Sequence, residues 1–142
     1  MERDPDRVAF LIPGVTYSAE RPLLHFARAV FLRHGWTTQE VWWPERPPQR
    51  EGQDLHLWFT RLRCFVHAHM GQILSVEVAP KIALVGKSMG AFAAALAADR
   101  RLPAIWLTPV LDHGMETAGD PVNSADILRR TTVAMDEFVA RL

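Results

Sequence analysis

Short apolar segments alternate with segments of helical periodicity along the whole chain. The apolar segments are rich in β-branched and aromatic residues, which is typical of buried strands. Strands that alternate with helices pair in parallel through right-handed crossovers, and the helices then cover both faces of the sheet. The length of 142 residues is enough for one domain with its own core. We therefore expect an α/β fold: a single-domain, three-layer α/β/α sandwich over residues 1–142, with a short, mainly parallel sheet.

The boundaries of the expected elements follow from apolar runs and from residues that start or stop helices. The expected strands are residues 8–14, 36–43, 81–85 and 103–108, and the expected helices are residues 22–34, 54–70, 88–99 and 124–142. Pro22 suits a first helical turn, Gly35 suits a helix stop, and Asp54 and Ser124 suit N-caps. The apolar face of the last helix is expected to contain Ile127, Thr131, Ala134, Met135, Phe138 and Leu142.

The order of the strands follows from how apolar they are. Residues 8–14 and 81–85 are the most uniformly apolar, so we expect them in the centre of the sheet, and the predicted order is 36–43, 8–14, 81–85, 103–108. In such sheets, ligands bind beyond the carboxyl ends of the strands where the chain order reverses. Here these ends carry Gly14-Val15 and residues 87–89, which places a candidate site between them.

Charge and cysteine content give no indication of several classes of partner. Lys plus Arg equals Asp plus Glu, at 16 each, so neither nucleic acid nor an anionic membrane surface is expected to bind. The single Cys64 cannot form an intramolecular disulfide, which favours a reducing compartment, and we expect it to be a buried structural thiol. The first residues, MERDPDR, lack the apolar stretch of a secretory signal, and no apolar run approaches the roughly 20 residues of a membrane span. We expect a soluble cytoplasmic protein with no metal and no cofactor.

The pentapeptide GKSMG, residues 86–90, allows two functional interpretations. Its first three residues end like a phosphate-binding P-loop, but the first glycine of that motif would fall at Lys81, at the start of an apolar strand. The G-x-S-x-G pattern of a nucleophilic serine needs a strand, a tight turn and a helix in succession, and this stretch provides all three. Gly86 and Gly90 leave room for the strained turn around Ser88. The alternative is a serine that caps a helix between two packing glycines.

A nucleophilic serine needs a base and hydrogen-bond donors for the oxyanion. The backbone N–H groups of Met89, at the helix start, and of Val15, in the turn after residues 8–14, could converge on one point. His113 lies in a loop after residues 103–108, at the same sheet edge as Ser88, and its alternative role is that of a solvent-exposed loop histidine. The remaining histidines are expected on helix surfaces: His25, His34, His56, His67 and His69.

From Val8 onward, these segments together resemble the α/β-hydrolase fold family in its small, lidless bacterial form. FLIPGVTY resembles the third core strand and oxyanion turn, VGKSMGAFAA the nucleophile elbow, PAIWLTPVL the sixth strand, and LDHGMETAGD the segment with the catalytic histidine. The resemblance implies Ser88 as nucleophile, His113 as general base, and the N–H groups of Met89 and Val15 as the oxyanion hole. It also implies an esterase-like serine hydrolase that cleaves a small ester or related acyl substrate through an acyl-enzyme.

The chain departs from that family where the seventh and eighth strands would be. Only PVL separates the last expected strand from Asp112-His113, so the strands that lead to the triad acid have no counterpart. Asp112, Glu116 and Asp120 are the local carboxylates, and the sequence does not select among them. The alternative function is therefore a weakly active or inactive remnant that serves as a binding or interaction module.

The same shortening leaves residues 103–108 at an edge of the expected sheet. After Pro103, this segment carries no charge or proline that would block pairing with another strand. Because two-fold dimers are the commonest way to cover such a surface, we expect a homodimer through this strand or the last helix. The five tryptophans are expected to pack in the core and at edges, with one of Trp42 and Trp43 exposed.

Overall fold

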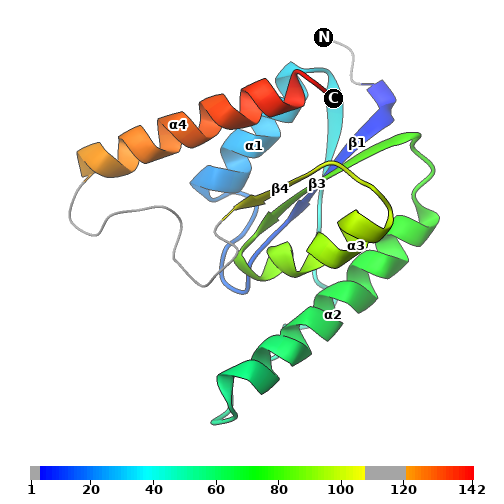
Figure 1. Ribbon diagram of the computed structural model, residues 1–142, viewed down its shortest axis with the longest axis vertical. Coiled ribbons are helices and arrows are strands. Elements are labelled where there is room, and N and C mark those ends of the chain that lie inside the picture. The colour runs from blue at the N-terminus through cyan, green and yellow to red at the C-terminus, as the bar shows by residue number, and fades with distance from the viewer. Residues whose placement is uncertain (1–3, 108–120) are drawn as a thin grey trace.

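The computed structural model describes residues 4–107 and 121–142, and within these ranges it contains a sheet of four strands in the order β2-β1-β3-β4. The strands are β1 (Asp4–Ile12), β2 (Trp36–Glu40), β3 (Lys81–Lys87) and β4 (Ala104–Leu107). Neighbouring strands pair in parallel. The helical elements are α1 (Pro22–Arg33), α2 (Leu55–Val76), the 3₁₀ helix η1 (Ser88–Ala93), α3 (Ala94–Asp99) and α4 (Pro121–Val139) (Figure 1). The parallel sheet and the strand order expected from the sequence are confirmed.

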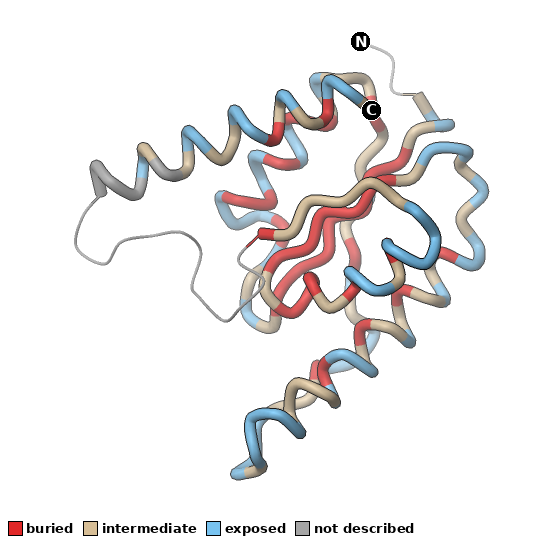
Figure 2. Tube along the Cα trace, viewed as in Figure 1, coloured by how far each residue is buried: buried red, intermediate tan, exposed pale blue. Residues whose placement is uncertain are grey.

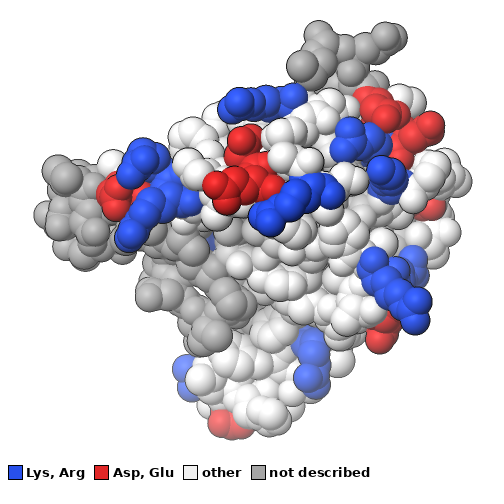
Figure 3. All heavy atoms as spheres, turned by 45° about the horizontal axis from the view of Figure 1, so that its top comes forward, with Lys and Arg blue, Asp and Glu red and all other residues white. Residues whose placement is uncertain are grey.

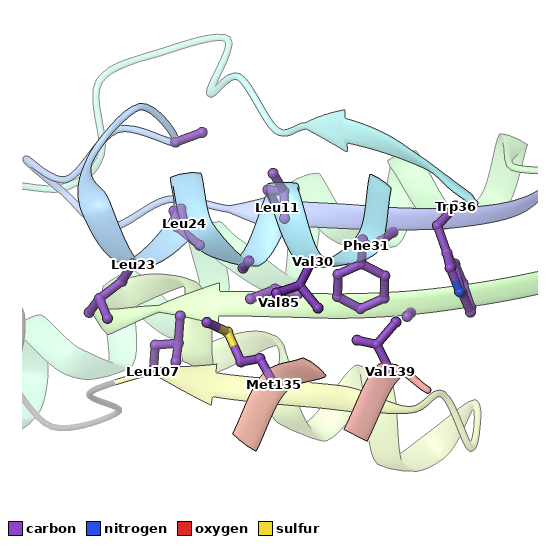
Figure 4. Close-up of a cluster of buried hydrophobic side chains, with 14 residues drawn as sticks. Leu11, Leu23, Leu24, Val30, Phe31, Trp36, Val85, Leu107, Met135 and Val139 are labelled. Atoms are coloured by element: carbon purple, nitrogen blue, oxygen red, sulfur yellow. The ribbon is translucent and has the colours of Figure 1, made fainter. Parts of the chain in front are cut away.

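The two faces of the sheet pack against separate helical layers. One face contributes Leu11 and Val85 to a cluster with side chains of α1 and α4, among them Met135 (Figure 4). The opposite face, with Phe10 and Leu84, packs against α2, η1 and α3. In Figure 1, α1 and α4 accordingly lie on one side of the sheet, and α2 and α3 lie on the other. The expected three-layer α/β/α sandwich is therefore confirmed.

The two central strands are the most deeply buried elements, as Figure 2 shows by their red colour. Every residue from Val8 to Ile12 in β1 is buried, and so is every residue from Ala83 to Lys87 in β3. Because helices cover both faces of these strands, both faces carry apolar side chains. The continuous apolar runs therefore indicated the central positions of β1 and β3 correctly.

Several element boundaries differ from those expected. β2 ends at Glu40 and not at residue 43, although the Val41 N–H still donates to the Leu11 carbonyl at 2.9 Å. α2 continues to Val76 and not to residue 70, because Leu74 extends its buried stripe. Residues 88–99 are not one α-helix, since their first part is η1.

The last helix also begins and packs differently from the expectation. α4 starts at Pro121, which suits a first helical turn, so Ser124 lies inside the helix and is not its N-cap. Among its described side chains, Met135 and Val139 are buried, whereas Ala134, which was expected in the apolar face, is exposed. Along its outer face, basic and acidic side chains are interspersed (Figure 3).

A polar contact reinforces the packing of α4 on α1. The His34 Nε2 atom, at the C-cap of α1, lies 2.8 Å from the Asp136 Oδ1 atom of α4. At the end of the chain, the Lys81 ammonium group donates to the Leu142 carbonyl at 3.3 Å. These contacts join α4 both to its neighbouring helix and to the start of β3.

Two expectations about single side chains have different outcomes. Cys64 is exposed on α2, so the expected buried thiol is wrong. Trp42 is 78% exposed while Trp43 packs against Phe65 with 5.3 Å between ring centroids, which confirms that one of the adjacent tryptophans is exposed. In the described ranges, the structure has no helix that is both long and apolar enough to cross a membrane.

Candidate active site

Ser88 occupies the sharp turn between the buried strand β3 and the helical elements η1 and α3. Its backbone φ angle is +54°, in the left-handed region that residues other than glycine rarely adopt. Such strain persists only where the surrounding structure holds it in place, and it is common at active sites. This strand–turn–helix arrangement is the one that the G-x-S-x-G pattern predicts.

The two glycines of the motif lie where no side chain fits. A Cβ atom on Gly86 would lie 2.6 Å from the Gly90 carbonyl oxygen and 2.8 Å from the Trp106 Cζ3 atom. A Cβ atom on Gly90 would collide with the carbonyl oxygen of Ile12, the last residue of β1. The turn around Ser88 is therefore packed directly on β1 and β4, and any larger residue would push it away from the sheet.

The loop after β1 meets this turn, as the predicted strand order requires. A Cβ atom on Gly14 would lie 3.3 Å from both the Ser88 Cβ atom and the Lys87 carbonyl oxygen. Strands β1 and β3 are parallel neighbours, so their carboxyl ends reach the same edge of the sheet. The two segments that the sequence singled out are therefore in contact.

Two backbone N–H groups near Ser88 remain available as donors. The Gly14 N–H donates to the Tyr17 carbonyl at 3.1 Å, whereas the Val15 N–H has no hydrogen-bond partner in the described part of the chain. Met89 lies in the first turn of η1, where N–H groups have no partner within the helix. Val15 and Met89 are the two residues predicted to hold an oxyanion.

Lys87 is buried beside the turn. Its side chain is 2% exposed, and its ammonium nitrogen lies 4.8 Å from the centroid of the Tyr17 ring. The Tyr17 hydroxyl in turn accepts a hydrogen bond from the Leu23 N–H at 3.0 Å. Lys87 and Tyr17 thus connect the end of β3 to the loop after β1 and to the start of α1.

A pocket of about 560 Å³ lies beside this loop, at the carboxyl ends of β1 and β2. It is formed by two continuous segments, residues 13–20 and residues 40–47. Gly14 and Val15 belong to its wall, and Gly14 also contacts Ser88. The second segment was not predicted, because no sequence motif marks it.

The predicted base lies outside the described residues. His113 belongs to residues 108–120, as do the carboxylates Asp112, Glu116 and Asp120. Their positions relative to Ser88 therefore remain predictions from the sequence.

The other histidines have various surroundings. His25 and His56 are exposed on helices, as expected. The His67 Nε2 atom lies 2.9 Å from the Phe92 carbonyl oxygen, so this histidine of α2 supports η1. His69 is enclosed by the ring of Phe65, at 4.4 Å between centroids, and by the ring of Trp43. Together with His34, which contacts Asp136 of α4, three of the expected surface histidines are therefore structural contacts between elements.

No family model and no curated protein matches this chain. Among solved structures, the chain is similar to a provisionally assigned hydrolase of the alpha/beta superfamily from Xanthomonas campestris pv. campestris. The sequence identity is 13% and the TM-score is 0.48, and the match covers 96% of this chain and 99% of that one.

Proposed function

We propose that this protein is a serine hydrolase of small esters or related acyl compounds, with Ser88 as its nucleophile. The observation that carries the proposal is the left-handed backbone of Ser88, at +54° in φ, between a buried strand and a helix. A helix-capping serine does not need this conformation, because N-cap residues have extended backbone angles. A nucleophile on a sharp turn does need it, since the turn lifts the hydroxyl out of the sheet edge.

In the proposed reaction, the Ser88 Oγ atom attacks the acyl carbon while His113 accepts the hydroxyl proton. The carbonyl oxygen becomes an oxyanion and accepts hydrogen bonds from the N–H groups of Met89 and Val15. The C–O bond to the alcohol then breaks, and the alcohol leaves with the proton from His113. Water next attacks the acyl-enzyme, giving its proton to His113, and the carboxylic acid leaves as Ser88 regains a proton.

The proposed roles of Ser88, Met89 and Val15 are supported by the positions of these residues around the turn. The proposed roles of Gly86 and Gly90 are supported by the lack of room for a side chain at either position. His113 is supported only by its place in the sequence after β4.

A fluorophosphonate probe tests the nucleophile directly, because it forms a covalent bond only with an activated serine. We expect one label per chain at Ser88 and no label on Ser88→Ala. Ser75→Ala is the matched control, since Ser75 is exposed near the end of α2 and is not in the site. Equal labelling of the wild type and of Ser88→Ala would reject the proposal.

Turnover of an activated phenyl ester separates a working hydrolase from an inactive remnant. We expect hydrolysis well above the Ser88→Ala background, and a fall on the order of 10³-fold or more for His113→Ala. His56→Ala is the matched control on an exposed helical histidine. Wild-type turnover at the Ser88→Ala level would support the remnant, and unchanged turnover in His113→Ala would remove that residue from the mechanism.

A further inference from the structure

The pocket beside the loop after β1 has the size and position of a binding site for part of a substrate. Its volume of about 560 Å³ falls within the roughly 300–1,000 Å³ of typical small-molecule sites. Gly14 lies in its wall, and a Cβ atom on Gly14 would lie 3.3 Å from the Ser88 Cβ atom. One wall of the pocket therefore lies next to Ser88.

The lining of the pocket favours an apolar group. Large or apolar side chains supply most of its wall: Pro13, Val15, Tyr17, Ala19, Val41, Trp42, Trp43, Pro44 and Pro47. The apolar surface that the ligand and the pocket bury against each other stabilises the complex in proportion to its area. A hydrocarbon or aromatic arm would meet such a surface along both segments that form the pocket.

The charges at the pocket do not favour an anion. Among the described residues that line it are three carboxylates, Glu20, Glu40 and Glu45, and one basic residue, Arg46. Glu40 is paired with Arg28 at 3.0 Å, and Glu45 lies 3.5 Å from His69. The described residues of the wall therefore carry no excess of positive charge that would attract an anionic arm, so charge gives an anion no advantage over an uncharged arm.

We infer that this pocket binds an uncharged, mainly apolar arm of the acyl substrate while its carbonyl group lies at Ser88. The inference rests on the proposed function and adds to it the class of substrate: a neutral ester or related acyl compound with one extended apolar arm. Val15 then has two roles, because its side chain lines the pocket and its N–H belongs to the proposed oxyanion hole.

Binding is tested on the Ser88→Ala protein, so that the outcome does not depend on catalysis. The probes are N-butylhexanamide, a neutral amide, and hexanoate, which offers the same acyl chain as an anion. By isothermal titration calorimetry we expect the amide to bind at least about tenfold more tightly than hexanoate. Equal affinity, or tighter binding of hexanoate, would overturn the inference.

Two further variants locate the binding. Thr16→Trp adds bulk at an exposed position of the pocket wall, and Trp42→Ala removes an exposed apolar surface from it. In the Ser88→Ala background, each should weaken binding of the amide by about fivefold or more, whereas Ser75→Trp should not. Unchanged affinity in both pocket variants would show that the amide binds elsewhere and would overturn the inference.

Turnover in the chain with Ser88 intact identifies the arm. One series of 4-nitrophenyl esters lengthens the acyl chain, and one series of acetate esters lengthens the alcohol. For each series, the ratio of kcat/KM for the long-chain ester to kcat/KM for the short-chain ester is measured with and without Thr16→Trp. If Thr16→Trp lowers this ratio in the acyl series, the pocket binds the acyl chain, and if it lowers the ratio in the alcohol series, the pocket binds the alcohol. No change in either ratio would contradict the inference. Failure of fluorophosphonate labelling together with intact amide binding would reject the nucleophile without rejecting the pocket.

Discussion

At the scale of the residue, the site depends on the absence of side chains as much as on the serine. Gly90 contacts the Ile12 carbonyl so closely that a methyl group has no space, whereas Gly71 in α2 has nothing within 4 Å of a would-be Cβ. A glycine is thus required at position 90, where a side chain has no room, but not at position 71, where it has room.

This difference predicts opposite results for the same substitution. Gly90→Ala should destabilise the protein by about 1–3 kcal/mol through overpacking, and it should also abolish labelling of Ser88 by displacing the turn. Gly71→Ala should stabilise by about 0.5–1 kcal/mol, because alanine loses less entropy than glycine in a helix. Urea denaturation with both variants measures this. Equal effects of the two substitutions would contradict the packing of the turn on β1.

The sequence predicted the turn around Ser88 but not the position of Lys87, for a physical reason. Ser88 and its two glycines lie within five residues, and the backbone requirement of the turn is local to these residues. The pentapeptide was therefore sufficient to predict the turn. The position of Lys87 was missed because the strand was expected to end at Val85, whereas β3 continues to Lys87. With the longer strand, the period of two places Lys87 on the same face as Ala83 and Val85, which are buried. Its contact with Tyr17 depends on the loop conformation and has no sequence signal.

At the scale of the element, two of the described side chains of α4, Met135 and Val139, are buried. Met135 is 3% exposed and contacts the cluster under α1, whereas Val133 is 49% exposed on the same helix. Apolar residues occur on more than one side of this helix, among them Ala134 and Val139. The position of α1 decided which of them is buried, and no pattern within α4 could indicate that position.

Truncation of Met135 should therefore loosen α4 selectively. We expect Met135→Ala to cost about 2–5 kcal/mol of stability and Val133→Ala to have little effect. Hydrogen exchange by mass spectrometry should show faster exchange in α4 of Met135→Ala than in β1 or β3, which remain covered on the other face by α2. Similar costs for the two substitutions would mean that α4 is not anchored through Met135.

At the scale of the whole molecule, the unpaired edge of β4 is the feature that bears most on assembly. In the described residues, β4 pairs with β3 alone, so its other edge is not paired in the sheet. Three of its residues are half-buried and Leu107 is buried. The apolar character of this strand was evident in the sequence, but what covers its edge depends on other parts of the chain or on a second copy.

The homodimer stays a prediction, and it can be measured. Gel filtration with light scattering at micromolar concentration should give about twice the chain mass of 16.1 kDa, because an unpaired parallel edge strand recruits another strand. Hydrogen exchange should then show that the backbone amides of β4 are protected, and this protection should decrease when the protein is diluted. A stable mass of one chain would mean that the edge is covered within the monomer.

The register of β1 also has a consequence for the order in which the molecule folds. Val8 pairs with Thr37 in β2 and with Ile82 in β3, so the second pairing closes a much longer stretch of chain. The extra closure entropy grows only with the logarithm of the length, on the order of 1 kcal/mol here, so it affects stability little. Folding rates respond more strongly to such distant contacts. We therefore expect the pairing of β1 with β2 to form earlier in folding than the pairing of β1 with β3, so that Ser88, at the end of β3, takes its place against a strand that is already paired.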